Sequence, residues 1–246
     1  PVCRMDARRL RGRQSRMKPI GIIGGMGPAS TVIYYETLCQ LARNRYGGNA
    51  SARVIIDALD FGEVQALQQA GEWDEAGRQL AASGRRLEQA GAGLILLATN
   101  TMHKVAAPLE AALKVPFVHI VDATAARLTA DGRTAPALLG TRYTMEEPFY
   151  PNHFAGAFGA PPLIPDTPER DDIHRIIFDD LVKGIVTPET TRRYIEIVEA
   201  LAKRGADSVI LGCTEIGLVL NTANSPLPVY DSARIHCEAA MGLAYV

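Results

Sequence analysis

Short apolar runs alternate with longer segments of helical spacing along most of the chain. Runs such as "GLILLAT" (93–99) are typical of buried strands, and segments such as 72–92 place apolar residues three and four positions apart, as an amphipathic helix does. The first half predicts strands over 19–25, 52–61, 93–99 and 116–123 and helices over 28–48, 72–92 and 103–115. The second half predicts strands within 134–144, over 161–166 and over 207–215, and helices at the start of 145–158, within 169–206 and over 231–246. This alternation favours parallel sheets covered by helices, an α/β fold.

The two halves of the chain repeat the same order of predicted strands and helices. Gly91-Ala92 opens "AGAGLILLAT" and Gly205-Ala206 opens "RGADSVILGC", and each pair is followed eight residues later by a corner residue, Thr99 or Cys213. The corners are therefore 213 − 99 = 114 residues apart. We predict two pseudo-symmetric parallel-sheet domains of the Rossmann or flavodoxin-like kind. Residues 17–117 with 218–246 form the first, residues 118–217 form the second, and the active site lies in the cleft between them.

The two corners carry the candidate chemistry. Ligands of open α/β sheets bind beyond the carboxyl ends of the strands, so a pseudo-twofold arrangement places Thr99 and Cys213 on opposite sides of one cleft. A thiol and a hydroxyl on opposite faces suit racemisation, in which one group removes an α-proton and another returns it. We expect a helix N-terminus after Cys213 to stabilise its thiolate. The side chains of Asn100, Thr101 and Thr214 suit the substrate carboxylate.

Composition and cysteine content indicate the cellular compartment and the kind of binding partner. The chain has 246 residues, 47% of them hydrophobic, and a formal net charge of −1, so we expect a small-molecule substrate and neither a nucleic-acid nor a membrane partner. The cysteines are scattered without C-x-x-C pairs, which favours free thiols in a reducing cytoplasm. Their positions are Cys3, Cys39, Cys213 and Cys237.

The basic N-terminal segment and the spacing of the histidines lead to two further expectations. The first sixteen residues hold six arginines and one acidic residue and precede "MKPIGIIGG"; we interpret residues 1–16 as a disordered basic tail or as sequence upstream of a natural start at Met17. We predict no metal site, because four of the histidines show no ligand spacing. These are His119, His153, His174 and His236. His103, in the turn after Thr99, is either a residue that tunes the site or a helix-surface or capping residue.

Four motifs in this order, "GIIGGMGPAST", "TNTMH", "LLGTRYTM" and "GCTEI", resemble the aspartate/glutamate racemase family from Met17 onward. The resemblance implies a cofactor-independent amino-acid racemase, homodimeric, acting on aspartate, glutamate or a related amino acid. Cys213 matches the second catalytic cysteine of that family. Thr99 stands where most relatives carry the first, a departure shared with an enterobacterial subgroup of L-aspartate/glutamate-specific or broad-specificity racemases.

The same resemblance carries over positions that contact substrate. They are Met26, Gln68, Asn100, Thr101, Thr141, Thr144, Thr214 and Glu215. Glu215 either orients Cys213 or favours the start of a helix. Many relatives place a lysine where this chain has Val182, and Lys183 is a weak substitute for it.

Three other functions remain open from the sequence. Arylmalonate decarboxylases resemble this scaffold and keep only the second cysteine, so a one-faced decarboxylase or isomerase is possible, although "TNTMH" retains a polar turn suited to amino acids. A nucleotide-binding module is disfavoured, because Gly25-x-Gly27-x-x-Ser30 lacks the last glycine of G-x-G-x-x-G. A non-catalytic binder of small ligands is the third alternative.

Overall fold

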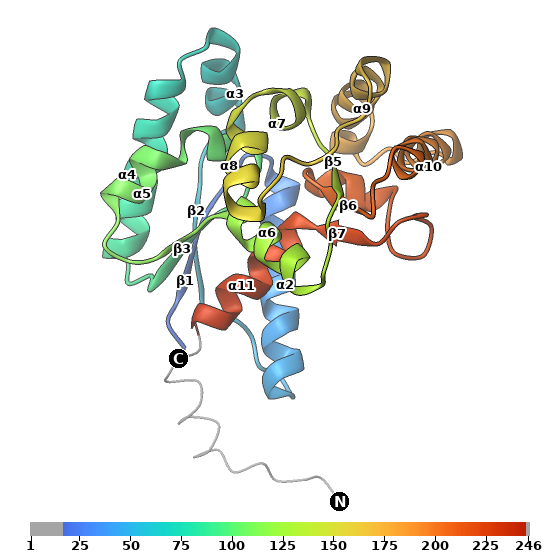
Figure 1. Cartoon of the computed structure of the whole chain (residues 1–246). Helices are drawn as coiled ribbons and strands as arrows, with labels where there is room; N and C mark the ends of the chain where they lie inside the picture. Colours follow the sequence, from blue (N-terminus) through green and yellow to red (C-terminus); the bar gives the residue numbers. More distant parts are fainter. Residues whose placement is uncertain (1–16, 245–246) are drawn as a thin grey trace, which may run out of the picture.

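The computed structural model describes residues 17–244 and contains two parallel sheets (Figure 1). The first has the order β2-β1-β3-β4, and its strands are β1 (Ile20–Gly24), β2 (Val54–Ala58), β3 (Leu94–Leu97) and β4 (Phe117–Val118). The second has the order β5-β6-β7, and its strands are β5 (Pro136–Leu139), β6 (Ser208–Leu211) and β7 (Val229–Asp231). The predicted α/β class with two parallel sheets is confirmed. The expectation for residues 1–16 lies outside the described part of the chain.

Helices follow nearly every strand. In the first half they are α2 (Pro28–Tyr46), α3 (Phe61–Ala70), α4 (Trp73–Gln89), the 3-10 helix η1 (Thr101–Val105) and α5 (Ala106–Ala112). After β4 come α6 (Ile120–Ala130), α7 (Arg142–Glu146), α8 (Phe149–Phe158), α9 (Thr167–Asp179), η2 (Leu181–Lys183), α10 (Pro188–Lys203), η3 (Thr214–Leu218) and α11 (Ser232–Ala244). Among the helices of residues 17–244, none is both long and apolar enough to cross a bilayer.

The internal repeat appears in the strand positions. β3 begins at Leu94 and β6 at Ser208, an offset of 208 − 94 = 114 residues, equal to the offset between the two corners. Both strands are fully buried and lie inside their sheets, with β1 beside β3 and β5 beside β6. The carboxyl end of an inner strand therefore positions each corner.

Each sheet buries its own core. In the first sheet, Ile22 faces α2 and α11, and Ile23 faces α4, so helices cover both sides, as Figure 1 shows. The chain returns from β7 of the second sheet into α11, whose Cys237 and Met241 lie in the first core, as expected for the C-terminal helix. The last helix thus joins the two halves.

Several predicted elements were wrong in kind. Only residues 117–118 of the predicted strand 116–123 are extended, because His119 caps a helix there: its Nδ1 accepts the N–H of Val121. The predicted strand 161–166 reduces to a single bridge between Leu163 and Ala137. Sequence analysis also missed β7 and the whole of α3, which Asp60 caps through the N–H of Glu63.

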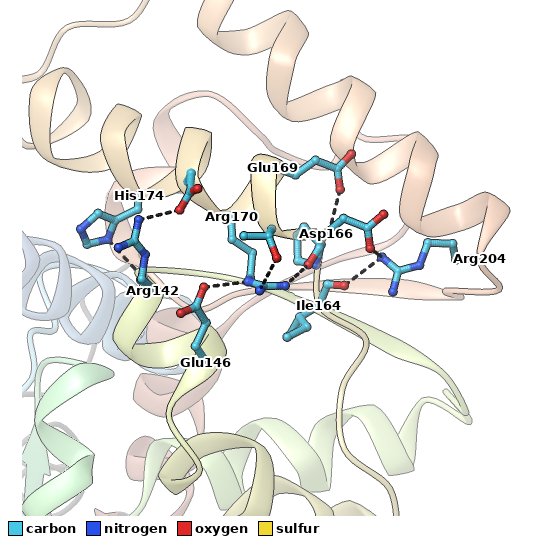
Figure 2. Close-up of polar contacts among 11 residues, drawn as sticks. Arg142, Glu146, Ile164, Asp166, Glu169, Arg170, His174 and Arg204 are labelled. Atoms are coloured by element: carbon cyan, nitrogen blue, oxygen red, sulfur yellow. Dashed lines mark hydrogen bonds and ion pairs between the residues drawn. The ribbon is translucent and has the colours of Figure 1, made fainter.

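Charged side chains hold α7 against α9, the arrangement drawn in Figure 2. Arg142 pairs with Asp171 on α9, and its backbone N–H donates to Nδ1 of His174. Arg170 of α9 pairs with Glu146 at 2.8 Å and also donates to the carbonyl of Pro165. These bonds fix the first turn of α7, which lies at the carboxyl end of β5.

Candidate functional site

The second corner is a short hydrogen-bonded chain built on Cys213, two residues after β6. The Cys213 thiol donates to Oε2 of Glu215 at 3.0 Å, and the Thr214 hydroxyl donates to the same oxygen at 2.7 Å. Oγ of Ser30 lies 2.6 Å from Oγ1 of Thr214, and the Ser30 hydroxyl also donates to Oε1 of Glu215 at 3.4 Å. Ser30 lies in the first turn of α2, so this chain joins the two halves of the molecule.

The protonation state of Cys213 differs from the expectation. Burial raises the pKa of its thiol well above the usual value, and the charge of Glu215 and the hydrogen bond to it raise the pKa further. The backbone N–H of Glu215 acts in the opposite direction but more weakly. The predicted stabilisation of a thiolate by backbone N–H groups is present as the N–H of Glu215, but burial and the Glu215 carboxylate outweigh it. Cys213 rests as a thiol.

Threonine hydroxyls from both halves gather beside the first corner. Thr101, the first residue of η1, has its Oγ1 3.4 Å from Oγ1 of Thr141, which in turn lies 3.2 Å from Oγ1 of Thr144. Thr141 caps α7 by accepting the Thr144 N–H, and both are buried. The structure thus brings three predicted binding residues together from both halves.

Asn100 connects the first corner to the second. Its Nδ2 donates to Oγ of Ser232 at 3.1 Å, and the Ser232 hydroxyl donates to the carbonyl of Leu211, two residues before Cys213. Because the Ser232 proton is used, its oxygen can only accept, which fixes the Asn100 amide with Nδ2 toward Ser232. Oδ1 of Asn100 is buried and has no hydrogen-bond partner within residues 17–244. It is an unpaired acceptor on the residue that follows Thr99.

Of two other predicted binding residues, Met26 lies in the first core and Gln68 is partly exposed. Met26 is 6% exposed and precedes Gly27 through a cis peptide bond in the turn after β1. Gln68 is on α3, and its amide donates to the sulfur of buried Met102 at 3.0 Å. Gln68 is therefore tied to η1, the segment that carries Thr101.

Side chains of the two halves also meet outside the polar corners. Lys104 of η1 pairs with Glu147, just after α7, at 2.5 Å, and its Nζ lies 3.7 Å from the centre of the Trp73 ring. The Trp73 ring makes an edge contact with Tyr143 at 6.3 Å. These contacts hold η1 of the first half against α7 of the second.

Two residues that link the two halves, Ser30 and Ser232, were not predicted from the sequence. Ser30 stands inside the motif "GIIGGMGPAST", in the first turn of α2, the helix that follows the carboxyl end of β1, where the strand-end rule could have suggested it. Ser232 opens the C-terminal helix, and only the tertiary fold brings it between Asn100 and Leu211.

Three potential metal ligands lie close together on the surface of the second half. Ligand atoms of His119, Asp122 and His153 lie within 4.8 Å of one another. The His119 and His153 rings stack in parallel at 3.9 Å, with an angle of 5° between them. Imidazole binds a metal in the plane of its ring, so two parallel stacked rings cannot share one ion without turning. The absence of a metal stays a prediction.

Acid should unfold the protein through its buried histidines. His236 accepts from the Tyr34 hydroxyl at 2.8 Å and donates to the Val118 carbonyl at 2.6 Å, and burial lowers its pKa to about 4. Below pH 6.5 the unfolded chain therefore binds more protons at this histidine than the folded protein does. The stabilisation that depends on a neutral His236 is complete above that pH and is lost as the pH falls toward 4. Between pH 7 and pH 5 we expect the free energy of unfolding to fall by about 2 kcal/mol through His236 alone.

Urea unfolding at pH 7, 6 and 5 measures this loss. His236→Gln keeps a neutral polar side chain, so its free energy of unfolding should depend less on pH than that of the wild type. Equal slopes for the two proteins would contradict the assignment.

Comparison with known proteins agrees with this architecture. The family model described as Asp/Glu/hydantoin racemase matches residues 23–240. The broad-specificity amino-acid racemase RacX of Bacillus subtilis (strain 168) is 23% identical over 243 residues, covering 92% of this chain and 99% of RacX.

Two solved structures are similar over nearly their whole length. A Yersinia pestis protein provisionally described as an Asp/Glu racemase is 39% identical, with a TM-score of 0.88 over 93% of this chain and 99% of that one. An aspartate racemase homologue from Pyrococcus horikoshii OT3 is 33% identical, with a TM-score of 0.83 and the same coverage. This chain belongs to the Asp/Glu/hydantoin racemase family.

Proposed function

We propose that the protein is a cofactor-independent amino-acid racemase in which Cys213 and Thr99 handle the α-proton on opposite faces of the substrate. The observation that carries the proposal is the thiol–carboxylate contact of Cys213 and Glu215 at the end of β6, at 3.0 Å. The relatives named above support amino acids as the substrate class. Aspartate, glutamate and similar amino acids are the substrates to test first.

The carboxylate of Glu215 supplies a route to the reactive thiolate. The thiol proton moves from Sγ of Cys213 to Oε2, which it already contacts, and the thiolate then removes the α-proton of the substrate. The electron pair of the broken C–H bond is delocalised into the substrate carboxylate. Returning the proton from Cys213 to the same face restores the starting enantiomer.

Return of a proton from the opposite face gives the other enantiomer. The Thr99 hydroxyl donates its proton to the α-carbon and is reprotonated by water, and the hydroxide so formed takes the proton held by Glu215, which restores the carboxylate. In the reverse direction Thr99 must remove the α-proton, and to do so its hydroxyl must first lose its own proton. A hydroxyl is a far weaker acid than a thiol, so this deprotonated form is scarce. Exchange on the Thr99 face is therefore slower than on the Cys213 face, although the equilibrium between enantiomers stays at one.

Neutral polar groups surround the proposed substrate position. Hydroxyls of Thr101, Thr141 and Thr144 donate to the substrate carboxylate and to the charge that develops on it. The open Oδ1 of Asn100 accepts from the α-ammonium group. Since these residues come from both halves, binding draws the two halves together.

Solvent exchange tests the proposal. The wild type is incubated in D2O with single enantiomers of a panel of amino acids that includes aspartate and glutamate, and loss of the α-proton signal and chiral chromatography are followed. We expect deuterium at the α-carbon and formation of the opposite enantiomer for at least one amino acid.

The other outcomes refute the proposal. No exchange with any amino acid of the panel would identify a binder without catalysis. Decarboxylation of phenylmalonate without amino-acid exchange would identify the one-faced reaction, which the single corner thiol also allows.

A further inference from the structure

His103 lies beneath the Thr99 corner, and the proposed reaction does not use it. It occupies the middle of η1, four residues after Thr99, and is 5% exposed. A buried imidazole is costly unless both of its nitrogens have partners. The partners of His103 therefore indicate what it does.

Both ring nitrogens are occupied, and the partners define the tautomer. The backbone N–H of Ile120 donates to Nε2 at 3.3 Å, so the ring proton is on Nδ1. Nδ1 donates to the carbonyl oxygen of Thr99 at 2.7 Å. Burial, and then the neighbouring His119 and His236, lower the pKa of His103 well below its usual value, so this neutral form persists at neutral pH.

Three other rings hold the imidazole in place. The His119 ring lies 4.5 Å away at 71°, Phe117 lies 5.7 Å away at 30°, and His236 lies 5.9 Å away at 67°. Phe117 is on β4, His119 caps α6 and His236 is on α11. His103 cannot turn without disturbing these three segments, so it is a rigid support.

We infer that His103 is a positioning residue for the Thr99 face. Its Nδ1–H fixes the Thr99 carbonyl, and this fixes the direction in which the Thr99 side chain leaves the backbone. The inference rests on the proposed two-faced reaction. Cys213 is held separately by Glu215, so loss of the His103 bond should impair one face and spare the other.

Two matched polar variants separate the bonds of His103. Asparagine places its amide near the Nδ1 position and keeps a donor for the Thr99 carbonyl. Glutamine places its amide near the Nε2 position and loses that bond. The faces are assigned with Thr99→Ala and Cys213→Ala, and α-proton exchange in D2O is measured for the L and D substrates separately.

We expect His103→Gln to slow exchange on the Thr99 face about 10- to 100-fold, the cost of a small misplacement of a catalytic group, and His103→Asn to recover most of the rate. Exchange on the Cys213 face and alkylation of Cys213 by iodoacetamide should stay near wild type in both variants. Equal Thr99-face rates in the two variants, or parallel loss on both faces, would overturn the inference.

Nitrogen NMR of the wild type gives a readout that does not depend on activity. The Nδ1–H tautomer of His103 supports the inference, and a proton on Nε2 overturns it. A wild type that exchanges no amino acid refutes the proposed function instead, so the two failures are distinguishable.

Discussion

Cys213→Ala is expected to abolish racemisation and to slow α-proton exchange on the Cys213 face by roughly 10²- to 10⁴-fold, the usual contribution of a general base. Alanine removes the sulfur that donates to Glu215 and that accepts the substrate proton in the proposed reaction. Cys213 is half-buried at the edge of its core, so its removal should change stability little. Exchange in D2O on each enantiomer measures the loss.

Cys39→Ala is the matched control. Cys39 is a buried thiol on α2 in the first core, remote in the chain from either corner, and its loss should leave exchange rates unchanged. Wild-type exchange in Cys213→Ala would show that another group removes the proton.

Thr99→Cys is expected to speed exchange on the slow face about 10-fold or more. The substitution places a thiol where a hydroxyl now must act as base, and the thiol ionises several pH units lower. Since its carbonyl stays bonded to His103, the new side chain leaves the backbone in the same direction. Initial rates from the two enantiomers should become more nearly equal.

Thr99→Ser controls for the loss of the methyl group, because it keeps a hydroxyl and should show the slow rate of the wild type. If Thr99→Cys leaves the slow face unchanged, then Thr99 only holds a water molecule that transfers the proton, and acidity at this position does not limit the rate.

Most of the fold could be predicted because its signals are local. The apolar strands and the 114-residue repeat are present in the sequence itself and identify two similar sheets. The errors occur where tertiary contacts decide whether a segment becomes a helix or a strand. The run "FVHIV" has strand composition, but His119 caps a helix that buries Ile120 and Val121 in the second core. β7 has three residues, and its pairing with β6 makes it a strand.

The candidate site could be predicted in outline only. The strand-end rule and the repeat selected Thr99 and Cys213, and the threonine cluster around Thr141 agrees with the positions implied by resemblance. The acidity of Cys213 could not be predicted, because it depends on burial and on where the Glu215 carboxylate points. Ser232 was missed for a similar reason, since its partners are far away in sequence.

The bridge made by Ser232 has a consequence for how the protein matures during synthesis. Both Thr99 and Cys213 leave the ribosome before α11 does, and domains generally fold as the chain emerges. Until Ser232 arrives, Asn100 has no bonded link to the strand that leads to Cys213. The nascent chain therefore carries both corner residues before this bridge can form, and a product truncated before residue 232 would lack the bridge between Asn100 and the Leu211 carbonyl.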